Sequence, residues 1–279
     1  MDIEALVLAV LLGVVQGVLE WLPVSSEGGV ALALSLVTGE SGGVSTRFAL
    51  VLHVGTAVAA FAYYRGELFD IARDVPDWRP RAAFDATNAD LSFLGVATLT
   101  SGVVGIGVYL LFREVVSELA GGGFVAAVGA LLVVTGLVQR VAETYGLGER
   151  EWPDPLDAVL VGAMQGLALL PGVSRSGTTV SVLLLRGHDG EGALRLSFLL
   201  SIPASLGAGL LVVLGDGVPA VSPLAAVLAL VASAVVGYLT VGALVALVRR
   251  VAFWGVCVGF GALAVASGGA LMLVDVGLL

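Results

Sequence analysis

Two stretches of similar sequence decide how this chain folds: QGVLEWLPVSSEG at residues 16–28 and QGLALLPGVSRSGTT at residues 165–179. In each stretch a proline stops one helix, and a serine can cap the next. The uncharged runs beside the first stretch, residues 5–19 and 28–39, are too short to cross a hydrocarbon core of about 30 Å at about 1.5 Å per helical residue. We therefore expect two helix hairpins, residues 4–39 and 156–187, that enter the membrane and turn back.

Longer uncharged runs account for most of the remaining chain, and each is long enough to cross a membrane. Of the 279 residues 58% are apolar and 13% are charged, and the mean hydropathy is +1.04. This composition excludes a soluble globular domain and a disordered chain, and the net charge of −9 argues against nucleic-acid binding. The predicted fold class is an all-α integral membrane protein, one domain over residues 1–279, with six transmembrane helices and two re-entrant helix hairpins. The expected spans are residues 48–64, 91–112, 119–139, 196–215, 217–248 and 251–274.

The order of these segments predicts an internal repeat. A hairpin followed by three spans occurs twice, and three crossings reverse the side of the membrane on which the next hairpin begins. Gln16 lies twelve residues before Gly28, as Gln165 does before Gly177. We therefore expect an inverted-topology repeat of residues 1–145 and 155–279, with the functional site near the midplane, where the two interruptions meet. Chance similarity between two breaks rich in glycine and serine is the alternative.

The basic residues predict which ends of the helices face the cytoplasm. All 13 are arginines, and the predicted spans place most of them on one side of the membrane. Because cytoplasmic loops are enriched in basic residues, that side is expected to be cytoplasmic, and both termini and the site would face outward from a plasma membrane. The charged segment 65–90 would be a solvated cytoplasmic connection. The expected cytoplasmic arginines are Arg65, Arg73, Arg79, Arg81, Arg140, Arg150, Arg186, Arg195, Arg249 and Arg250, against Arg47 and Arg113 on the other side.

The charged residues also have an unusual composition. There are 22 acidic residues and no lysine, and the isoelectric point is near 4.6. This composition is typical of a halophile, whose exposed carboxylates hold water in strong salt. Codon usage rich in guanine and cytosine is the alternative explanation.

The residues around the two interruptions favour a site for phosphate. The start of a helix presents unpaired backbone N–H groups and a partial positive charge, which bind an oxyanion. The guanidinium of Arg175 can bind two phosphate oxygens, and the serine hydroxyls add donors. Glu20 lies between apolar segments, where a carboxylate is costly and usually functional. Gln16 and Glu20 share one helix face, a pattern that suits Mg²⁺ or another divalent cation, or a water molecule bound to phosphate.

Each of these features also has a structural explanation. Serines at helix starts usually act as caps, and a buried arginine can neutralise a structural carboxylate. The single cysteine, Cys257, excludes an internal disulfide, and no cluster of cysteine and histidine in the sequence predicts zinc. The combination of a carboxylate at membrane depth, paired serines and an arginine favours function over structure.

Both stretches resemble the signature motifs of the undecaprenyl-diphosphate phosphatase family. The first reads Gln16-Gly-x-x-Glu20-x-Leu-Pro23-x-Ser25-Ser26-x-Gly28, and the second reads Pro171-Gly-x-Ser174-Arg175-Ser176-Gly-x-Thr179. The segment Ser197-Phe-Leu-Leu-Ser-Ile-Pro203 is also similar, and the likeness covers essentially the whole chain. The resemblance implies a membrane enzyme that removes one phosphate from a polyprenyl diphosphate of the undecaprenyl or dolichyl type. It also implies interlocked inverted repeats and an active site that opens outward.

The resemblance assigns an expected role to each matching residue. Ser26 would be the nucleophile or would hold the attacked phosphate, and Glu20 would be the acid–base group or a metal ligand. Arg175 would bind the diphosphate and stabilise charge in the transition state. The other predicted substrate-binding residues are Gln16, Ser25, Glu27, Gln165, Ser174, Ser176, Thr178 and Thr179.

Two positions depart from the family pattern. The family continues Ser-Ser-x-Gly-His, whereas this chain has Gly29 in place of the histidine, and Gln16 stands where many members have glutamate. The missing imidazole removes the expected general base, a loss of roughly 10²–10⁴ in rate. Glu27 is a candidate replacement. We expect His53 to serve helix packing and His188 to be solvated in a charged loop.

Two functions from different classes fit these residues. The first is a polyprenyl-diphosphate phosphatase, and the alternative is a polyprenyl-phosphate flippase or another anion transporter that uses the same phosphate cradle. The carboxylate, serine and arginine set favours the enzyme over the transporter and over a non-catalytic binding role. The expected partners are the polyprenyl diphosphate lipid and the bilayer, with a possible homodimer and no nucleic acid.

Overall fold

The computed structural model describes residues 3–118, 121–145, 148, 150–216, 222–248 and 250–275. Within these residues the chain is helical, apart from short turns and one isolated β-bridge between Arg150 and His188. The α-helices are α1 (Ile3–Leu19), α2 (Ser26–Thr38), α3 (Gly42–Arg73), α4 (Ala89–Glu118), α5 (Gly121–Tyr145), α6 (Pro155–Leu167), α7 (Arg175–Leu185), α8 (Gly190–Asp216), α9 (Pro223–Val248) and α10 (Phe253–Asp275).

Six of these helices, α3, α4, α5, α8, α9 and α10, are long and apolar enough to cross a membrane. They coincide with the six predicted spans, which confirms an all-α, multi-pass membrane protein. The outer ends of the predicted repeats, residues 1–2 and 276–279, lie outside the described residues, as do positions 119, 120 and 217–221 of the spans and Arg249.

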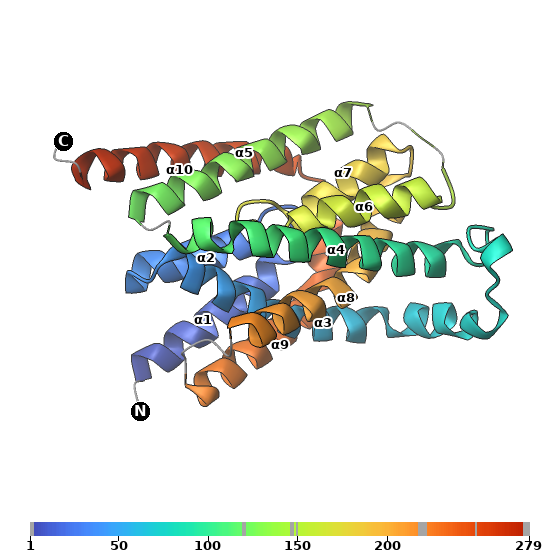
Figure 1. Ribbon diagram of the computed structural model, residues 1–279, viewed down its shortest axis with the longest axis horizontal. Helices are drawn as coiled ribbons and strands as arrows, with labels where there is room; N and C mark the ends of the chain where they lie inside the picture. Colours follow the sequence, from blue (N-terminus) through green and yellow to red (C-terminus); the bar gives the residue numbers. More distant parts are fainter. Residues whose placement is uncertain are drawn as a thin grey trace.

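The two helices that end the predicted halves, α5 and α10, lie side by side along one edge of the molecule (Figure 1). Their backbones approach closely where glycines face each other. A Cβ added to Gly122 would come within 2.3 Å of the carbonyl oxygen of Gly268, so this contact requires glycine. The glycine-rich stretch 261–269 therefore serves packing inside the chain.

Four short helices form two helix–loop–helix pairs among the long helices. The first pair is α1 and α2, and the second is α6 and α7; their loops lie in the interior of the molecule (Figure 1). Helix α1 packs on α9, and α6 packs on α4, so each pair is held by a long helix from the other half of the sequence. Buried apolar side chains such as Leu12 and Val161 fill these contacts. This packing fixes the positions of both loops.

The charged segment after the first long helix is only partly a loop. Helix α3 continues to Arg73, α4 begins at Ala89, and two 3-10 turns, Val75–Asp77 and Pro80–Ala82, lie between them. Residues 75–81 are exposed, as predicted. The segment is tied down where Trp78 donates a hydrogen bond from Nε1 to Ser92 Oγ at 2.9 Å.

The prediction that His188 is solvated is wrong. Only 2% of this residue is exposed, and its Nε2 lies 3.0 Å from Asp157 Oδ2. The chain turns back after α7 through Gly187, at a φ of 93°, which brings His188 over the start of α6. Arg186 and Arg150 both contact Asp154 there, and these ion pairs join the outer ends of α6 and α7.

Candidate active site

The first loop places Glu20 directly after α1. The last helical hydrogen bond runs from Glu20 N to Gln16 O at 3.0 Å, and Pro23 then prevents a continued helix. Ser25 caps α2 by accepting a hydrogen bond from Gly28 N at 3.0 Å. Ser26 is the first residue of α2, so its hydroxyl lies at a helix N-terminus.

The second loop repeats this local structure. It passes through Gly172 in the left-handed region, at a φ of 102°. Ser174 caps α7 by accepting a hydrogen bond from Gly177 N at 3.1 Å. Arg175 is the first residue of α7 and therefore occupies the position that Ser26 has in α2. The sequence prediction of two serine-capped helix starts is confirmed.

Direct hydrogen bonds join the two loops. Gly172 N donates to Ser25 Oγ at 3.0 Å, and Ser176 Oγ donates to Leu22 O at 3.0 Å. Gln139, on α5, also binds the first loop, because its Nε2 donates a hydrogen bond to Pro23 O at 2.6 Å. Residues that lie about 150 positions apart in the sequence are thus held as one unit.

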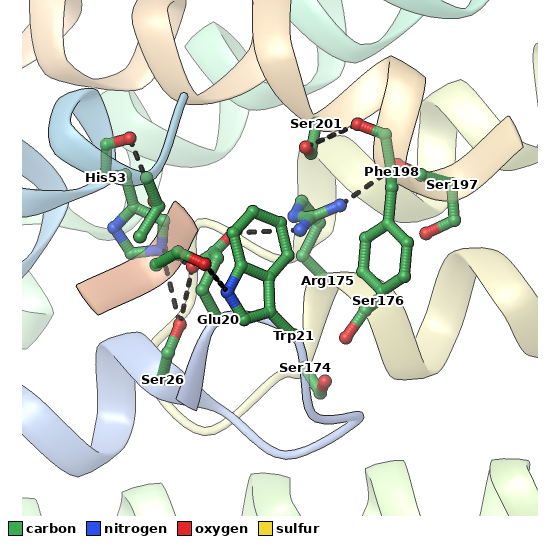
Figure 2. Close-up of polar contacts among 12 residues, drawn as sticks. Glu20, Trp21, Ser26, His53, Ser174, Arg175, Ser176, Ser197, Phe198 and Ser201 are labelled. Atoms are coloured by element: carbon green, nitrogen blue, oxygen red, sulfur yellow. Dashed lines mark hydrogen bonds and ion pairs between the residues drawn. The ribbon is translucent and has the colours of Figure 1, made fainter. Parts of the chain in front are cut away.

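Glu20 is the centre of the polar cluster, and Figure 2 shows it between Ser26 on one side and Arg175 on the other. Its Oε1 accepts from Arg175 Nη2 at 2.8 Å, while its Oε2 accepts from Gln16 Nε2 at 2.8 Å and from Ser26 Oγ at 3.0 Å. All four residues are predicted site residues, and the structure brings them together. An ion pair at this depth also offsets the cost of burying either charge alone.

The structure also places a histidine in this cluster, where the sequence prediction assigned only helix packing. His53, on α3, has its Nε2 at 3.3 Å from Glu20 Oε2 and at 3.5 Å from Ser26 Oγ (Figure 2). Its Nδ1 lies 2.8 Å from the carbonyl oxygen of Ala49. The signal that pointed to it was the missing histidine at position 29, which leaves the site in need of an imidazole from elsewhere.

Two predicted substrate-binding residues lie beside the cluster, and each has a side-chain oxygen without a hydrogen-bond partner among the described residues. Glu27 is buried on α2, and its Oε1 has no hydrogen-bond partner among the described residues. Gln165, on α6, donates from Nε2 to Ser101 Oγ at 3.2 Å, and its Oε1 is likewise without a partner there. Polar atoms of this kind, buried and unpaired, are typical of a site that awaits a ligand.

Other predicted residues are engaged mainly with the backbone of α7. Ser174 is its cap, and Thr178 donates from Oγ1 to Ser174 O at 2.9 Å. Thr179 donates to Arg175 O at 2.8 Å and pairs with Ser197 Oγ at 2.7 Å. These three residues orient the helix start that carries Arg175.

Two residues that were given no role hold the cluster in place. Arg175 Nη1 donates to Ser197 O, on α8, at 3.1 Å. Trp21, next to Glu20, is 1% exposed, donates from Nε1 to Gly237 O at 3.0 Å and packs edge-on against Phe198. Only the resemblance of residues 197–203 to the family segment hinted at this part of the site.

A cavity of about 320 Å³ opens at the cluster and continues between α4 and α8. His53, Glu27, Arg175 and Gln165 line its polar part. The rest of the wall is mostly apolar or small, and includes Ile106, Gly207, Leu210, Leu211 and Leu214. The cavity can therefore hold a charged group at one end and an apolar chain along its length.

The described residues contain no group of three or more His, Cys, Asp or Glu side chains placed to hold a metal ion. Mg²⁺, however, is usually held by one or two carboxylates together with substrate phosphates. The oxygen atoms at this site meet that requirement, because Glu27 Oε1 and Gln16 Oε1 are buried and unpaired next to the Glu20 carboxylate. The donor set fits Mg²⁺ bound with the substrate.

Comparison with protein families gives a match over nearly all of this chain. The model of the family described as bacitracin resistance protein BacA matches residues 9–265. The match includes both loops and every helix that contributes to the cluster.

Individual relatives agree with the family match. The chain is 62% identical to the undecaprenyl-diphosphatase of Haloarcula marismortui over 263 residues, which cover 94% of this chain and 97% of that protein. It is 36% identical to the undecaprenyl-diphosphatase of Methanococcoides burtonii, over 92% of this chain and 96% of the relative. The composition that predicts a halophile fits the similarity to the Haloarcula protein.

Proposed function

Because the chain belongs to the BacA family, we propose that it is a membrane phosphatase that hydrolyses a polyprenyl diphosphate to the monophosphate carrier and phosphate. The observation that carries the proposal is the cluster of Glu20, Ser26 and Arg175, which meets the polar end of an otherwise apolar cavity through Arg175. Its substrate is a lipid of the undecaprenyl or dolichyl type.

The cavity supports a lipid substrate over a water-soluble anion. The diphosphate would lie against Arg175 and the N-termini of α2 and α7, where the partial positive charge of a helix start favours an anion. The isoprenoid chain would follow the apolar wall between α4 and α8 toward Leu214. A small soluble phosphate would leave this wall uncovered.

Each residue of the cluster has a step to perform in phosphoryl transfer. Arg175 neutralises charge that builds on the phosphoryl oxygens and on the leaving phosphate. Ser26 holds its hydroxyl at the reacting phosphorus, and Glu20 orients both residues by accepting a hydrogen bond from each. The other loop residues keep this geometry fixed before the substrate arrives, which lowers the cost of reaching the transition state.

One observation also favours the alternative of a polyprenyl-phosphate flippase or anion transporter. A second cavity, of about 510 Å³, reaches Pro23 and Gly177 at the loops. Glu143 and Arg250 also line this cavity. In a transporter, the two loops would separate the first cavity from the second, as a central binding site separates the two sides of the membrane. Detection of lipid transfer between leaflets without phosphate release would favour this alternative.

The inverted repeat of residues 1–145 and 155–279 is part of the proposal. It is supported by the matching contacts of the two halves, in which α1 packs on α9 and α6 on α4. Helix α1 begins and α2 ends at one end of the molecule, while α6 begins and α7 ends at the other (Figure 1). We propose that both pairs are re-entrant hairpins entering a plasma membrane from opposite faces.

The orientation of the protein in the membrane is proposed from the distribution of its arginines. Helix α1 begins and α10 ends at the same end of the molecule, and the connection between α3 and α4 lies at the opposite end (Figure 1). By the positive-inside rule the end with Arg73, Arg79 and Arg81 faces the cytoplasm, so both termini and the active site face outward. We also propose a homodimer; Gly261 and Gly268 of α10 pack on α5 and would not supply its interface.

The phosphatase is tested by phosphate release from undecaprenyl diphosphate in detergent or liposomes. Ser26→Ala is expected to lower kcat at least about 10²-fold, because the hydroxyl at the reacting phosphorus is lost. Ser35→Ala, at the other end of the same helix, is the matched control and should retain wild-type activity. A Ser26→Ala protein that turns over at the wild-type rate would remove this residue from the mechanism.

The proposed cofactor is Mg²⁺ or another divalent cation, which when bound would neutralise phosphate charge. Glu20 and Glu27 would hold it, together with the amide oxygen of Gln16. Addition of Mg²⁺ is expected to raise the melting temperature of the wild-type protein in the presence of a diphosphate. In Glu27→Gln the increase should be clearly smaller, since one ligand charge is lost. An equal increase in both proteins would exclude Glu27 as a ligand.

A further inference from the structure

We propose that His53 is a further catalytic residue, whose imidazole takes the proton from the Ser26 hydroxyl while the diphosphate is cleaved. The inference rests on the proposed phosphatase function, and it names the general base that Gly29 cannot supply. It follows from the position of the His53 ring on α3, which lies beside the Ser26 hydroxyl and the Glu20 carboxylate of the first helix pair.

The backbone fixes which ring nitrogen can accept a proton. The carbonyl oxygen of Ala49, one turn earlier on α3, lies 2.8 Å from Nδ1 of His53. A carbonyl oxygen only accepts hydrogen bonds, so Nδ1 must carry the hydrogen. In the neutral ring the lone pair is then on Nε2, which is the nitrogen that faces Ser26.

The nitrogen with the lone pair is within reach of the proton that has to leave. Ser26 Oγ donates its proton to Glu20 Oε2 at 3.0 Å in this structure, and rotation of the hydroxyl turns the same proton toward His53 Nε2. His53 Nε2 is 3.5 Å from Ser26 Oγ, a loose contact of the kind that tightens when substrate binds. His53 also lines the cavity assigned to the substrate, so it is in contact with the space where the phosphate would lie. A histidine used only for packing would not need to face either group.

Glu20 supplies the counter-charge for the ring once the proton has moved. Its Oε2 lies 3.3 Å from His53 Nε2. Its Oε2 accepts the Ser26 hydroxyl in this structure, but a carboxylate that is paired with Arg175 is a weaker base than an imidazole, so Glu20 is better suited to stabilise an imidazolium than to keep the proton itself. The three residues share the roles of a serine, histidine and carboxylate triad, but here the serine and the carboxylate both lie at Nε2, and a backbone carbonyl orients the ring at Nδ1.

The proposed reaction has two steps. Ser26 Oγ bonds to the terminal phosphorus, the bond from that phosphorus to the bridging oxygen breaks, and its electron pair leaves with the polyprenyl phosphate. The Ser26 proton moves to His53 Nε2. Water then attacks the phosphoserine; its oxygen bonds to phosphorus, the P–Oγ bond breaks, and Oγ takes the proton back from His53. The proton lost by the water leaves with inorganic phosphate.

The experiment moves the imidazole from one helix to another. His53→Gln is expected to lower kcat about 10²–10⁴-fold while KM changes less than about threefold. Gly29 lies three residues after Ser26 on α2, hence on the same face of that helix, and a Cβ there meets only the end of the Leu19 side chain at 3.0 Å. In the double variant His53→Gln/Gly29→His we expect at least tenfold recovery of kcat.

Two controls separate this role from folding. His188→Gln removes the other buried histidine, which lies outside the cluster, and should retain wild-type kcat. If His53→Gln does not fold, His53→Ala is assayed with and without added imidazole, which can enter the cavity, and we expect imidazole to raise its kcat.

The results distinguish failure of the inference from failure of the function. If wild-type protein releases phosphate and His53→Gln stays within about fivefold of it, His53 serves packing and the inference is wrong. Loss of activity that neither the second histidine nor imidazole restores also overturns it. If the wild-type protein releases no phosphate from the lipid, the proposed function fails and the inference fails with it.

Discussion

Replacing Arg175 by alanine is expected to lower kcat/KM for phosphate release at least about 10³-fold. The guanidinium is the group that meets the phosphoryl oxygens, and loss of an arginine that stabilises transition-state charge has effects of about 10³–10⁵. Arg175→Lys should recover only a small part of the activity, because a lysine keeps the charge but cannot bind two oxygens side by side. The measurement is phosphate release at several lipid concentrations, so that kcat and KM are separated.

Arg175→Ala should also destabilise the protein, and a second variant separates the two effects. Without Arg175 the buried Glu20 carboxylate loses its ion pair, and breaking a buried pair in this way costs about 3–5 kcal/mol. The double variant Glu20→Gln/Arg175→Gln carries no charge at this pair and should regain most of the lost melting temperature. It should remain inactive.

Two outcomes would contradict this assignment. Turnover of Arg175→Ala near the wild-type rate would mean that the phosphate lies elsewhere in the cavity. Recovery of activity in the uncharged double variant would mean that Arg175 serves only to neutralise Glu20, which is the structural explanation considered from the sequence.

The elements that the sequence predicts well are those with local causes. The spans follow from uncharged runs, and the two helix starts follow from Ser25 and Ser174 after Pro23 and Pro171. The expected role of Ser26 follows from the resemblance of its motif to the family, and that of Arg175 from a guanidinium that can bind phosphate oxygens beside a helix start. Charge at membrane depth singled out Glu20 for a similar reason.

The part that the sequence could not predict depends on how the helices pack. His53 is 27 positions from Ser26 and lies on an apolar helix, where a histidine is usually a packing residue. Its direction is decided by the contact between α2 and α3, which no local pattern encodes. His188 was misplaced for the same reason, because the turn at Gly187 folds a charged segment back onto Asp157.

Gly172→Ala is expected to separate the two loops and to remove at least about 99% of the activity. A Cβ at this position would lie 2.4 Å from the carbonyl oxygen of Val128, on α5, and the φ of 102° is itself unfavourable for alanine. To relieve the clash the second loop must move, and the hydrogen bond from Gly172 N to Ser25 Oγ would then break. A shift of about 1 Å between Arg175 and Ser26 is enough to cost roughly 10²-fold in rate.

The comparison with Gly187→Ala isolates the clash from the backbone strain. Gly187 has a similar φ of 93°, but its nearest neighbour for an added Cβ is Gly148 Cα at 3.8 Å, and it lies away from the cluster. Both variants should lose melting temperature, whereas only Gly172→Ala should lose activity in the fraction that remains folded. Ser25→Ala breaks the same hydrogen bond without a clash, so its activity should lie between the activities of wild type and Gly172→Ala. Equal activity of the folded Gly172→Ala and Gly187→Ala proteins would show that the contact between the loops is not needed to align Ser26 with Arg175.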